Sequence, residues 1–393
     1  MIVHVGIDEG DIVGDTNTAI QRAVDAVGSY GGGTVELSAG CFTLYDSVRL
    51  RRNVRLVGAG ADTVLRKCDG PASGFVVDAD YGQKKVTVND PSGFRAGMGV
   101  VISDDRSGGW IDTLATITLV QGDVVYLDRL LAMDYDADAG GLIANSFPPV
   151  AGFDVDSVVI EGLCLDGNRE NNRPINGCIG GGLYLHRARR CRIADCVVRD
   201  FAGDGISFQI TQEVTVERCE ITRVTGLGLH PGTGSARPVV RDCKSHENGE
   251  DGLFLCWRVQ EGRFEGNEFF ANGRHGISIG HKDTDNVFEN NVMRGNGAHG
   301  LYFRDEKPTN AGSRNVFRRN LIEDNAGCGV RVDGHTTDLL FEDNTVRDTR
   351  TGEARTQRVG ISVGEHGGRI RSVRNGLENH VEAATQGEVV NED

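Results

Sequence analysis

Apolar and polar residues alternate in short stretches that recur along most of the chain. Each stretch opens with a glycine, as in Gly182-Leu183-Tyr184-Leu185 and Gly276-Ile277-Ser278-Ile279. A period of two is typical of β-strands, whose successive side chains point to opposite faces. The opening glycines are Gly182, Gly205, Gly228, Gly252, Gly276, Gly300, Gly329 and Gly360, at intervals of 23, 23, 24, 24, 24, 29 and 31 residues.

A second series of short apolar stretches lies between these units, and a thiol or amide residue follows each of them. These residues are Cys196, Cys219, Cys243, Asn267, Asn291, Asn320 and Asn344. Asn tolerates the left-handed backbone of a tight turn, and its amide can bond the Asn of the neighbouring repeat. We therefore expect a stacked ladder at one corner of each repeat, with buried free thiols as its first members.

A repeat of about 23 residues is the length of one coil of short strands joined by tight turns. It is too short for a four-stranded propeller blade, and it lacks the consensus of leucine-rich repeats. The sequence therefore predicts an all-β fold, a right-handed parallel β-helix in which each coil pairs in parallel with the next.

Two segments depart from the repeat. The amphipathic residues 19–27 follow possible capping residues and predict a helix that covers the open end of the β-helix. Residues 82–145 contain hairpin-like turns and predict a small antiparallel β insertion. The expected division is 1–81 for the cap and first coils, 82–145 for the insertion, 146–375 for the main β-helix and 376–393 for a loose polar tail.

The composition excludes some classes of partner. The chain has 42 Lys and Arg against 57 Asp and Glu, for a formal net charge of −15. Such a chain lacks the broad positive surface that binds nucleic-acid phosphates. No stretch approaches the ~18 apolar residues of a membrane span. We therefore expect neither a nucleic-acid nor a membrane partner.

The ten cysteines do not have the spacing of a small disulfide scaffold. The first residues, Met1 to Gly6, have neither a basic region nor a long apolar stretch, so no signal peptide is visible. We therefore expect a reducing, cytoplasmic compartment, and a secreted protein only if a leader has been removed.

The N-terminal part and the repeats resemble a known superfamily. The residues that carry the resemblance are Gly14-Asp15-Thr16, Ala19-Ile20-Gln21, Gly31-Gly32-Gly33-Thr34-Val35, Gly40, Leu56-Val57-Gly58-Ala59-Gly60 and the repeats from 153 to 375. They are similar to pectate-lyase-like β-helix proteins, which include polysaccharide lyases, polygalacturonase-type hydrolases, mannuronan C5-epimerases and phage tailspikes. The resemblance implies the fold, whereas this scaffold carries several chemistries.

Two local matches are more specific. The segment from Arg274 to Gly280 resembles the Gly-His-Gly-Ile-Ser-Ile-Gly segment of polygalacturonases, whose acidic pair would fall at Glu250-Asp251 and whose arginine would fall at Arg304. The third Asp of that family has no counterpart near Leu227. The coils that contain Asp251 and His275 are also similar to the catalytic coils of mannuronan C5-epimerases. Their Tyr-Gly-Phe-Asp-Pro-His element would fall at residues 227–232, where only His230 could abstract a proton.

The repeat also predicts which side chains lie together. Residues that precede the repeat glycines should stack about 4.8 Å apart at a bend. This column is Gly181, Asp204, Leu227, Asp251, His275, His299, Cys328 and Val359. Two outward columns should follow, one from Tyr184 through Ser207, His230, Phe254 and Ser278 to Tyr302, the other from His186 through Gln209, Gly232, Cys256 and Gly280 to Arg304. One wall would thus gather carboxylates, imidazoles, an arginine and aromatic rings, which suit sugar binding and acid–base chemistry.

The candidate catalytic residues on this wall are Glu250, Asp251, His275, Asp204 and His230. The candidate substrate-binding residues are Arg304, Tyr302, Trp257, Lys282, Tyr184 and His186. Any single Asp or Glu at such a turn is more often a solvated turn residue than a catalytic one.

The polar loop 280–286 could bind substrate or a cation such as Ca²⁺, although turn-capping Asp side chains explain it as well. The second polar loop, 166–173, is expected to overhang the same wall. No spacing of Cys or His indicates a zinc site, and no cofactor is expected.

Three functions remain open at this point. The favoured function is hydrolysis of glycosidic bonds in a poly- or oligosaccharide, with Glu250 or Asp251 as acid and the other carboxylate or Asp204 activating water. The first alternative is β-elimination or C5 epimerisation of a uronate, with His230 or His275 as base and Arg304 neutralising the sugar carboxylate. The second is a non-catalytic glycan-binding or structural β-helix, possible as a homo-oligomer like the trimeric tailspikes.

Overall fold

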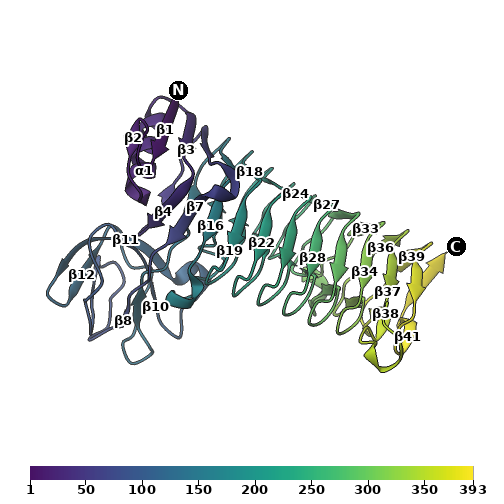
Figure 1. Ribbon diagram of the computed structural model, residues 1–393. Coiled ribbons are helices and arrows are strands. Elements are labelled where there is room, and N and C mark those ends of the chain that lie inside the picture. Colours follow the sequence, from purple (N-terminus) through teal and green to yellow (C-terminus); the bar gives the residue numbers. More distant parts are fainter. Residues whose placement is uncertain (393) are drawn as a thin grey trace.

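Three parallel sheets run along a single stack of coils, and most coils contribute one strand to each sheet. The computed structural model describes residues 1–392. The stack runs from the helix α1 (Asn17–Ser29) at the N-terminal end to the last strands at the other end, and a separate lobe projects beside its first coils (Figure 1). The strand pairings within the three long sheets are parallel throughout, which confirms the predicted β-helix.

Sheet A has 14 strands in the spatial order β2 (Ile12–Val13), β1 (Ile2–Gly6), β3 (Gly33–Leu37), β6 (Val54–Val57), β15 (Val159–Glu161), β18 (Arg192–Ala194), β21 (Thr215–Glu217), β24 (Val239–Arg241), β27 (Arg263–Glu265), β30 (Val287–Glu289), β33 (Val316–Arg318), β36 (Leu340–Glu342), β39 (Ile370–Val373) and β42 (Val389–Glu392). Sheet B has 11 strands in the order β4 (Gly40–Leu44), β7 (Thr63–Lys67), β16 (Cys164–Asp166), β19 (Val197–Arg199), β22 (Glu220–Thr222), β25 (Lys244–His246), β28 (Glu268–Phe270), β31 (Val292–Arg294), β34 (Leu321–Glu323), β37 (Thr345–Arg347) and β40 (Gly376–Glu378).

Sheet C also has 11 strands, in the order β5 (Val48–Arg49), β14 (Val150–Phe153), β17 (Leu183–His186), β20 (Ile206–Gln209), β23 (Leu229–Gly232), β26 (Leu253–Phe254), β29 (Ile277–Ile279), β32 (Leu301–Phe303), β35 (Val330–Val332), β38 (Val359–Val363) and β41 (Ala383–Gln386). The glycine-led units of the sequence form sheet C, and the second apolar series forms sheet A. The strands of sheet B directly follow the residues of the thiol and amide ladder. The sequence pattern predicts only two series of strands and does not distinguish this third one.

The six-stranded antiparallel lobe is made of β8 (Ala72–Gly74), β13 (Leu142–Ala144), β10 (Gly99–Ser103), β11 (Thr113–Gln121), β12 (Val124–Leu127) and β9 (Lys85–Thr87). It has a core of its own that includes Val100, Ile117 and Tyr135. The predicted hairpin between β11 and β12 is present. The lobe begins with β8 at Ala72, ten residues before the expected boundary at residue 82, because β8 pairs with the distant β13.

One file of the apolar interior contains a phenylalanine from each of four successive coils. Phe264, Phe288, Phe317 and Phe341 are buried and stacked, with ring centroids 4.6, 4.6 and 5.0 Å apart. At the N-terminal end, α1 buries Ile20, Val24 and Val27 against the first coils, so the predicted capping helix is confirmed. The polar end of the chain differs from the expected loose tail, because β41 and β42 pair in parallel with β38 and β39 as a further coil.

A ladder of buried amides joins the coils at the turn between sheets A and B. Asn291 accepts hydrogen bonds from the backbone N–H and the side-chain amide of Asn267, at 3.0 and 2.9 Å. It donates to Phe264 O at 2.8 Å and, through its own N–H, to Asn320 Oδ1 at 2.9 Å. The ladder begins with the buried thiols of Cys196, Cys219 and Cys243, as expected.

The left-handed backbone of this turn lies one residue before the ladder, not on it. Arg218, Asp242 and Asp343 have φ of 50°, 54° and 56°, and each directly precedes a ladder residue. The ladder amide is therefore free to point inward and bond to its neighbours, while the preceding residue makes the corner. The expectation that Asn itself adopts the left-handed conformation was wrong by one position.

Oppositely charged side chains at these left-handed corners pair across neighbouring coils. Arg218 bonds Asp195 at 2.8 Å, and Arg374 bonds Asp343 at 2.8 Å. The corner between sheets C and A behaves alike, with Arg314 against Asp285 at 2.6 Å. All these corner residues have positive φ. An exposed ion pair of this kind contributes little free energy by itself, roughly 0–1 kcal/mol.

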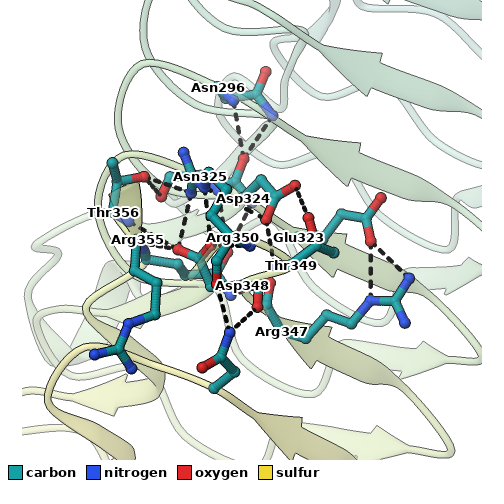
Figure 2. Close-up of polar contacts among 12 residues, drawn as sticks. Asn296, Glu323, Asp324, Asn325, Arg347, Asp348, Thr349, Arg350, Arg355 and Thr356 are labelled. Carbon is teal, nitrogen blue, oxygen red and sulfur yellow. Dashed lines mark hydrogen bonds and ion pairs between the residues drawn. The ribbon is translucent and has the colours of Figure 1, made fainter. Parts of the chain in front are cut away.

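A buried carboxylate holds the long turn between β37 and β38. Figure 2 shows Asp348 surrounded by donors, with Arg350 bonding both of its oxygens at 2.8 and 2.9 Å. The backbone N–H groups of Thr356 and Gln357 donate to the same carboxylate at 2.8 Å each. Burial would raise the pKa of Asp348, but these donors hold it well below its usual range. In the same view, Asn325 Oδ1 accepts a hydrogen bond from the side-chain amide of Asn296. The two residues belong to a second interior ladder of amides.

The amide ladder gives a first testable prediction. Replacing Asn291→Ala leaves the amide of Asn267 and the carbonyl of Phe264 without partners in a buried site. We expect the free energy of unfolding to fall by about 3 kcal/mol, measured by urea denaturation. The matched control is Asn310→Ala, since the Asn310 side chain makes only one long contact, at 3.5 Å, with Thr309. Equal stability of the two variants would contradict a structural role for the ladder.

Candidate active site

The three predicted columns of side chains are present along sheet C. Tyr184 pairs with Ser207, and Ser207 pairs with His230. Phe254 pairs with Ser278, and Ser278 with Tyr302. The column that precedes the glycines is also in register, because each glycine N–H donates to the column residue of the next coil, as Gly228 does to Asp251 O at 2.9 Å. Stacking therefore brings together residues that are 23 or 24 positions apart.

The first part of this wall is covered by a loop, residues 174–181, that the repeat pattern does not predict. Ser207 Oγ donates to Gly177 O at 2.6 Å, and the Tyr184 hydroxyl donates to Cys178 O at 2.7 Å. Tyr184 is only 1% exposed as a result. It was expected to contact substrate, but it lies beneath the loop and holds it in place.

Asp204 and His230 form a buried hydrogen-bonded pair. His230 Nδ1 lies 2.7 Å from Asp204 Oδ2, and the other oxygen of Asp204 accepts the N–H of Leu227 at 2.9 Å. Because the carboxylate accepts at Nδ1, the proton of a neutral imidazole sits there and Nε2 carries the lone pair. Nε2 is buried and has no hydrogen-bond partner. The two residues were predicted as separate candidates, and the structure brings them together.

This pair lines a cleft of about 480 Å³ beside the covering loop. One side of the cleft is formed by Asn176, Gly177 and Cys178 of the loop, and the other by Asp204 and His230. Further lining residues are Pro174, Ile175, Gly203, Thr225, Gly226, Leu227 and Glu250. A Cβ atom on Gly177 would lie 1.7 Å from Asp204 Oδ2, so only glycine fits at that point.

Glu250 is the exposed carboxylate of this cleft. Its side chain is half exposed and lies 3.5 Å from Arg274. Arg274 also approaches Asp251 at 4.0 Å. The predicted neighbours Glu250 and Asp251 thus face different environments, because the first lies at the cleft and the second is fully buried.

Asp251 and His275 lie on adjacent coils as predicted, and both serve the backbone. Asp251 Oδ1 accepts the N–H of His275 at 2.9 Å, and His275 Nδ1 accepts the N–H of His299 at 3.2 Å. His299 Nδ1 accepts the N–H of Cys328 at 2.8 Å in turn. These contacts form a ladder of side-chain acceptors. Asp251 Oδ2 remains buried without a partner.

Burial shifts the pKa values of this ladder in opposite directions. It raises the pKa of Asp251 to about 6, although the His275 N–H and Arg274 oppose the shift. It lowers the pKa of His275 to about 3, with a further contribution from the neighbouring His299. Both groups therefore favour their neutral forms. The His275 ring is stacked on Tyr302, 4.5 Å away.

Arg304 is occupied by the protein itself. Its guanidinium donates to Leu255 O at 2.7 Å and to Ser278 Oγ at 3.0 Å, and it lies 3.2 Å from Asp283 Oδ2. Asp283 is fully buried, and burial raises its pKa. Arg304 was expected to bind a substrate carboxylate, whereas its donors are used to neutralise Asp283.

The carboxylates of the loop 280–286 are likewise engaged. Asp283 pairs with Arg304, and Asp285 pairs with Arg314. Lys282 makes a left-handed corner, and its N–H donates to Asn310 O at 2.7 Å. Among the described residues, no three His, Cys, Asp or Glu side chains converge as a metal site would require.

Two exposed tryptophans lie at the same edge of sheet C. Trp257 is 51% exposed and stacks on His281 at 4.7 Å. Trp110, from the antiparallel lobe, lies 5.2 Å from His186. Both faces could contact a sugar ring. Trp110 was missed because nothing in the repeat places the lobe beside this edge.

A larger hollow, of about 740 Å³, lies where the lobe meets the first coils, and it includes Lys67. The Lys67 ammonium donates to Asn145 O at 2.6 Å and also to the side chains of Asn145 and Asn172. Burial lowers the pKa of Lys67 to about 8. All three donors are used within the protein, so Lys67 ties the lobe to the stack.

Comparison with known proteins agrees with this geometry. Residues 161–310 match the family model described as "Right handed beta helix region". The A-module of mannuronan C5-epimerase AlgE6 from Azotobacter vinelandii superposes with a TM-score of 0.61 and 16% identity, covering 96% of this chain and 95% of that one. The exopolygalacturonase of Thermotoga maritima superposes with a TM-score of 0.52 and 13% identity, covering 99% and 91%.

The chain has the right-handed parallel β-helix fold of these proteins. In sequence, this β-helix protein is 26% identical over 272 residues to mannuronan C5-epimerase AlgE2 of A. vinelandii, across 67% of this chain. The matched part spans only 18% of that epimerase. Within residues 1–392, the β-helix protein has no helix with the length and apolarity needed to cross a membrane.

The buried Asp251 predicts a pH-dependent stability. Its pKa rises from 3.8 in its usual range to about 6 on folding, so the folded state binds the proton more tightly. The stabilisation is complete below about pH 3.8 and is lost as the pH rises through 6, by about 3 kcal/mol. We expect the stability of the parent protein, minus the stability of Asp251→Asn, to fall by about 2 kcal/mol between pH 4 and 6.5, measured by urea unfolding.

The control is Glu250→Gln, which changes the neighbouring half-exposed carboxylate and should leave the pH dependence of the parent protein intact. A difference curve for Asp251→Asn that is flat from pH 4 to 7 would show that Asp251 is not the titrating group.

Proposed function

We propose that this protein modifies a polysaccharide that contains uronate residues, and that His230 removes the C5 proton of one such residue. The observation that carries the proposal is the buried Asp204–His230 pair, whose free Nε2 belongs to a residue that lines the cleft. Reprotonation from the opposite face gives the C5 epimer, and loss of the C4 oxygen gives an unsaturated product.

The pair has the features of a general base. Asp204 orients the imidazole through Nδ1 and stabilises the imidazolium that forms when Nε2 takes a proton. Burial keeps water away from Nε2, which lets the group retain its lone pair for the substrate. Glu250, on the same cleft, is placed to return a proton.

Proton removal at C5 requires that the negative charge of the sugar carboxylate be neutralised. Arg304 is committed to Asp283. Arg274 is the cation left near the cleft, because it is half exposed and contacts Glu250 at 3.5 Å. We assign it the role of binding the uronate carboxylate.

The similarity to mannuronan C5-epimerases supports this chemistry over hydrolysis. The site also departs from theirs, since Leu227 stands where the resemblance places a tyrosine. In this proposal the single base is therefore His230.

Hydrolysis remains the second candidate, on one observation. Asp204 and Glu250 line the same cleft, as a pair of acid and base carboxylates would. The fully buried Asp251 is a poor member of such a pair, so the hydrolytic assignment rests on Asp204 and Glu250.

Products distinguish these reactions. The full chain is incubated with polymannuronate, polyguluronate and polygalacturonate in deuterated water. We expect deuterium at C5 and an altered uronate composition by NMR, or an ultraviolet-absorbing unsaturated end if elimination follows. New reducing ends without absorbance or deuterium would assign hydrolysis instead.

The base is tested by His230→Gln, which should lower kcat by roughly 10³-fold or more with a smaller change in KM. The control is His246→Gln, which alters a histidine of sheet B stacked on Phe270, away from the cleft. Turnover of His230→Gln at the parent rate, on a substrate that the parent protein converts, would exclude His230 as the base.

A further inference from the structure

A positively charged hollow lies where the antiparallel lobe meets the first coils. It is the hollow of about 740 Å³ that includes Lys67, and we call it the junction hollow. Three cationic side chains line it, Arg66, Lys67 and Arg95, whereas Asp69 is the only carboxylate among the lining residues that the structure describes. The whole chain, by contrast, has a formal net charge of −15. The junction hollow is therefore a local positive site on an acidic protein.

Arg95 is the exposed cation of the junction hollow. It comes from the lobe, and its guanidinium lies 4.0 Å from the ring centre of Tyr45, which directly follows β4 of the stack. Within residues 1–392, no carboxylate forms an ion pair with Arg95. The stacking positions the guanidinium and leaves its N–H groups available to an anion.

The other two cations are only partly neutralised by the protein. The Lys67 ammonium bonds to neutral amide oxygens, and burial lowers its pKa to about 8, so it stays mostly protonated at pH 7. Arg66 lies 3.5 Å from Asp166, but Asp166 also lies 3.3 Å from Arg199. One carboxylate is thus shared between two guanidinium groups, and the junction hollow keeps an excess of positive charge.

A smaller hollow continues the junction hollow toward the cleft of the proposed base. The two hollows share Arg66, Asn168 and Asn171. The smaller one, of about 290 Å³, extends to Asp200, which lies four residues before Asp204 in the same turn. The two hollows and the cleft therefore follow one another along the turns between sheets B and C.

The register of sheet B gives the spacing of the two sites. Arg66 pairs with Asp166, and Asp166 pairs with Arg199 on the following coil. Arg199 ends the strand that leads into the turn of Asp204. The junction hollow and the cleft are therefore about two coils, or about 10 Å, apart along the stack.

We propose that the junction hollow binds the carboxylate of a second uronate on the polysaccharide whose reacting uronate occupies the cleft. The inference rests on the proposed function for the identity of this polymer. Arg95 donates to the carboxylate, and Arg66 and Lys67 add positive charge beneath it. The Asn171 amide donates to Asn168 at 2.9 Å and keeps its oxygen for a sugar hydroxyl. A polymer held at two sites binds more tightly than an oligomer that reaches one.

Binding is tested by calorimetric titration with size-fractionated oligomers of mannuronate, guluronate and galacturonate. The full chain carries His230→Gln, so that turnover does not alter the ligand. Adding Arg95→Gln should weaken binding of the longer oligomers by about tenfold or more, because a charge-assisted contact is lost. The shortest oligomers, which reach only one site, should lose less. The matched control is Arg129→Gln, which alters another exposed arginine of the lobe, outside the junction hollow.

Equal affinity of the Arg95→Gln and Arg129→Gln variants for every oligomer would overturn the second site. So would an equal loss of affinity for neutral mannan oligomers of the same length, since the contact would then not depend on the uronate carboxylate.

Turnover separates this inference from the proposed function. In the protein with His230 intact, Arg95→Gln should raise KM for the polymer by a similar factor and leave kcat unchanged, because Arg95 does not touch the reacting sugar. Arg95-dependent binding without any turnover would support the second site and reject the proposed function. Turnover with a KM that Arg95→Gln does not change would reject the second site alone.

Discussion

The fold depends on hydrogen bonds that run between coils instead of within them. A coil cannot satisfy its own backbone groups, so its N–H and C=O groups pair with the coils on both sides. The interior amides extend this rule to side chains. Asn291 bonds to the coils on both sides of its own, and its removal would leave buried donors and acceptors without partners. The positions of the other side chains, including those that line the cleft, follow from this stacking.

The same stacking provides both the scaffold and the proposed base. The column that precedes the repeat glycines supplies acceptors to backbone N–H groups, and Asp251, His275 and His299 are spent in this way. Asp204 occupies the same column but uses only one oxygen for the backbone. Its second oxygen accepts from His230, which lies three residues after Leu227, the column residue of the next coil. A position that elsewhere serves the backbone thereby orients a histidine, as the proposed base requires, without any change of fold.

The sequence predicts the coil register well, because a fixed spacing of 23 or 24 residues leaves little freedom in which strand meets which. The side-chain columns and the capping helix follow from that spacing. The hydrogen-bond partners of each side chain do not follow from the spacing. Asp251 and Asp204 have equivalent positions in their coils and differ only in the neighbouring side chain that each contacts. The positions of segments without a repeat could not be predicted from the sequence either. The loop 174–181 hides Tyr184, and the lobe brings Trp110 to sheet C, through contacts that no periodicity encodes.

The charged corners of the coils carry a consequence for how such a protein can grow. Acidic and basic residues alternate from one coil to the next at the turn after sheet A, as with Asp195, Arg218 and Asp242, and again with Asp343 and Arg374. Duplicating one coil would set like charges against each other, whereas duplicating two would preserve the alternation. Within these charged runs, the unit that can be inserted or deleted without electrostatic penalty is therefore the pair of coils, whereas the uncharged corners Gly266 and Asn290 between the runs set no such limit.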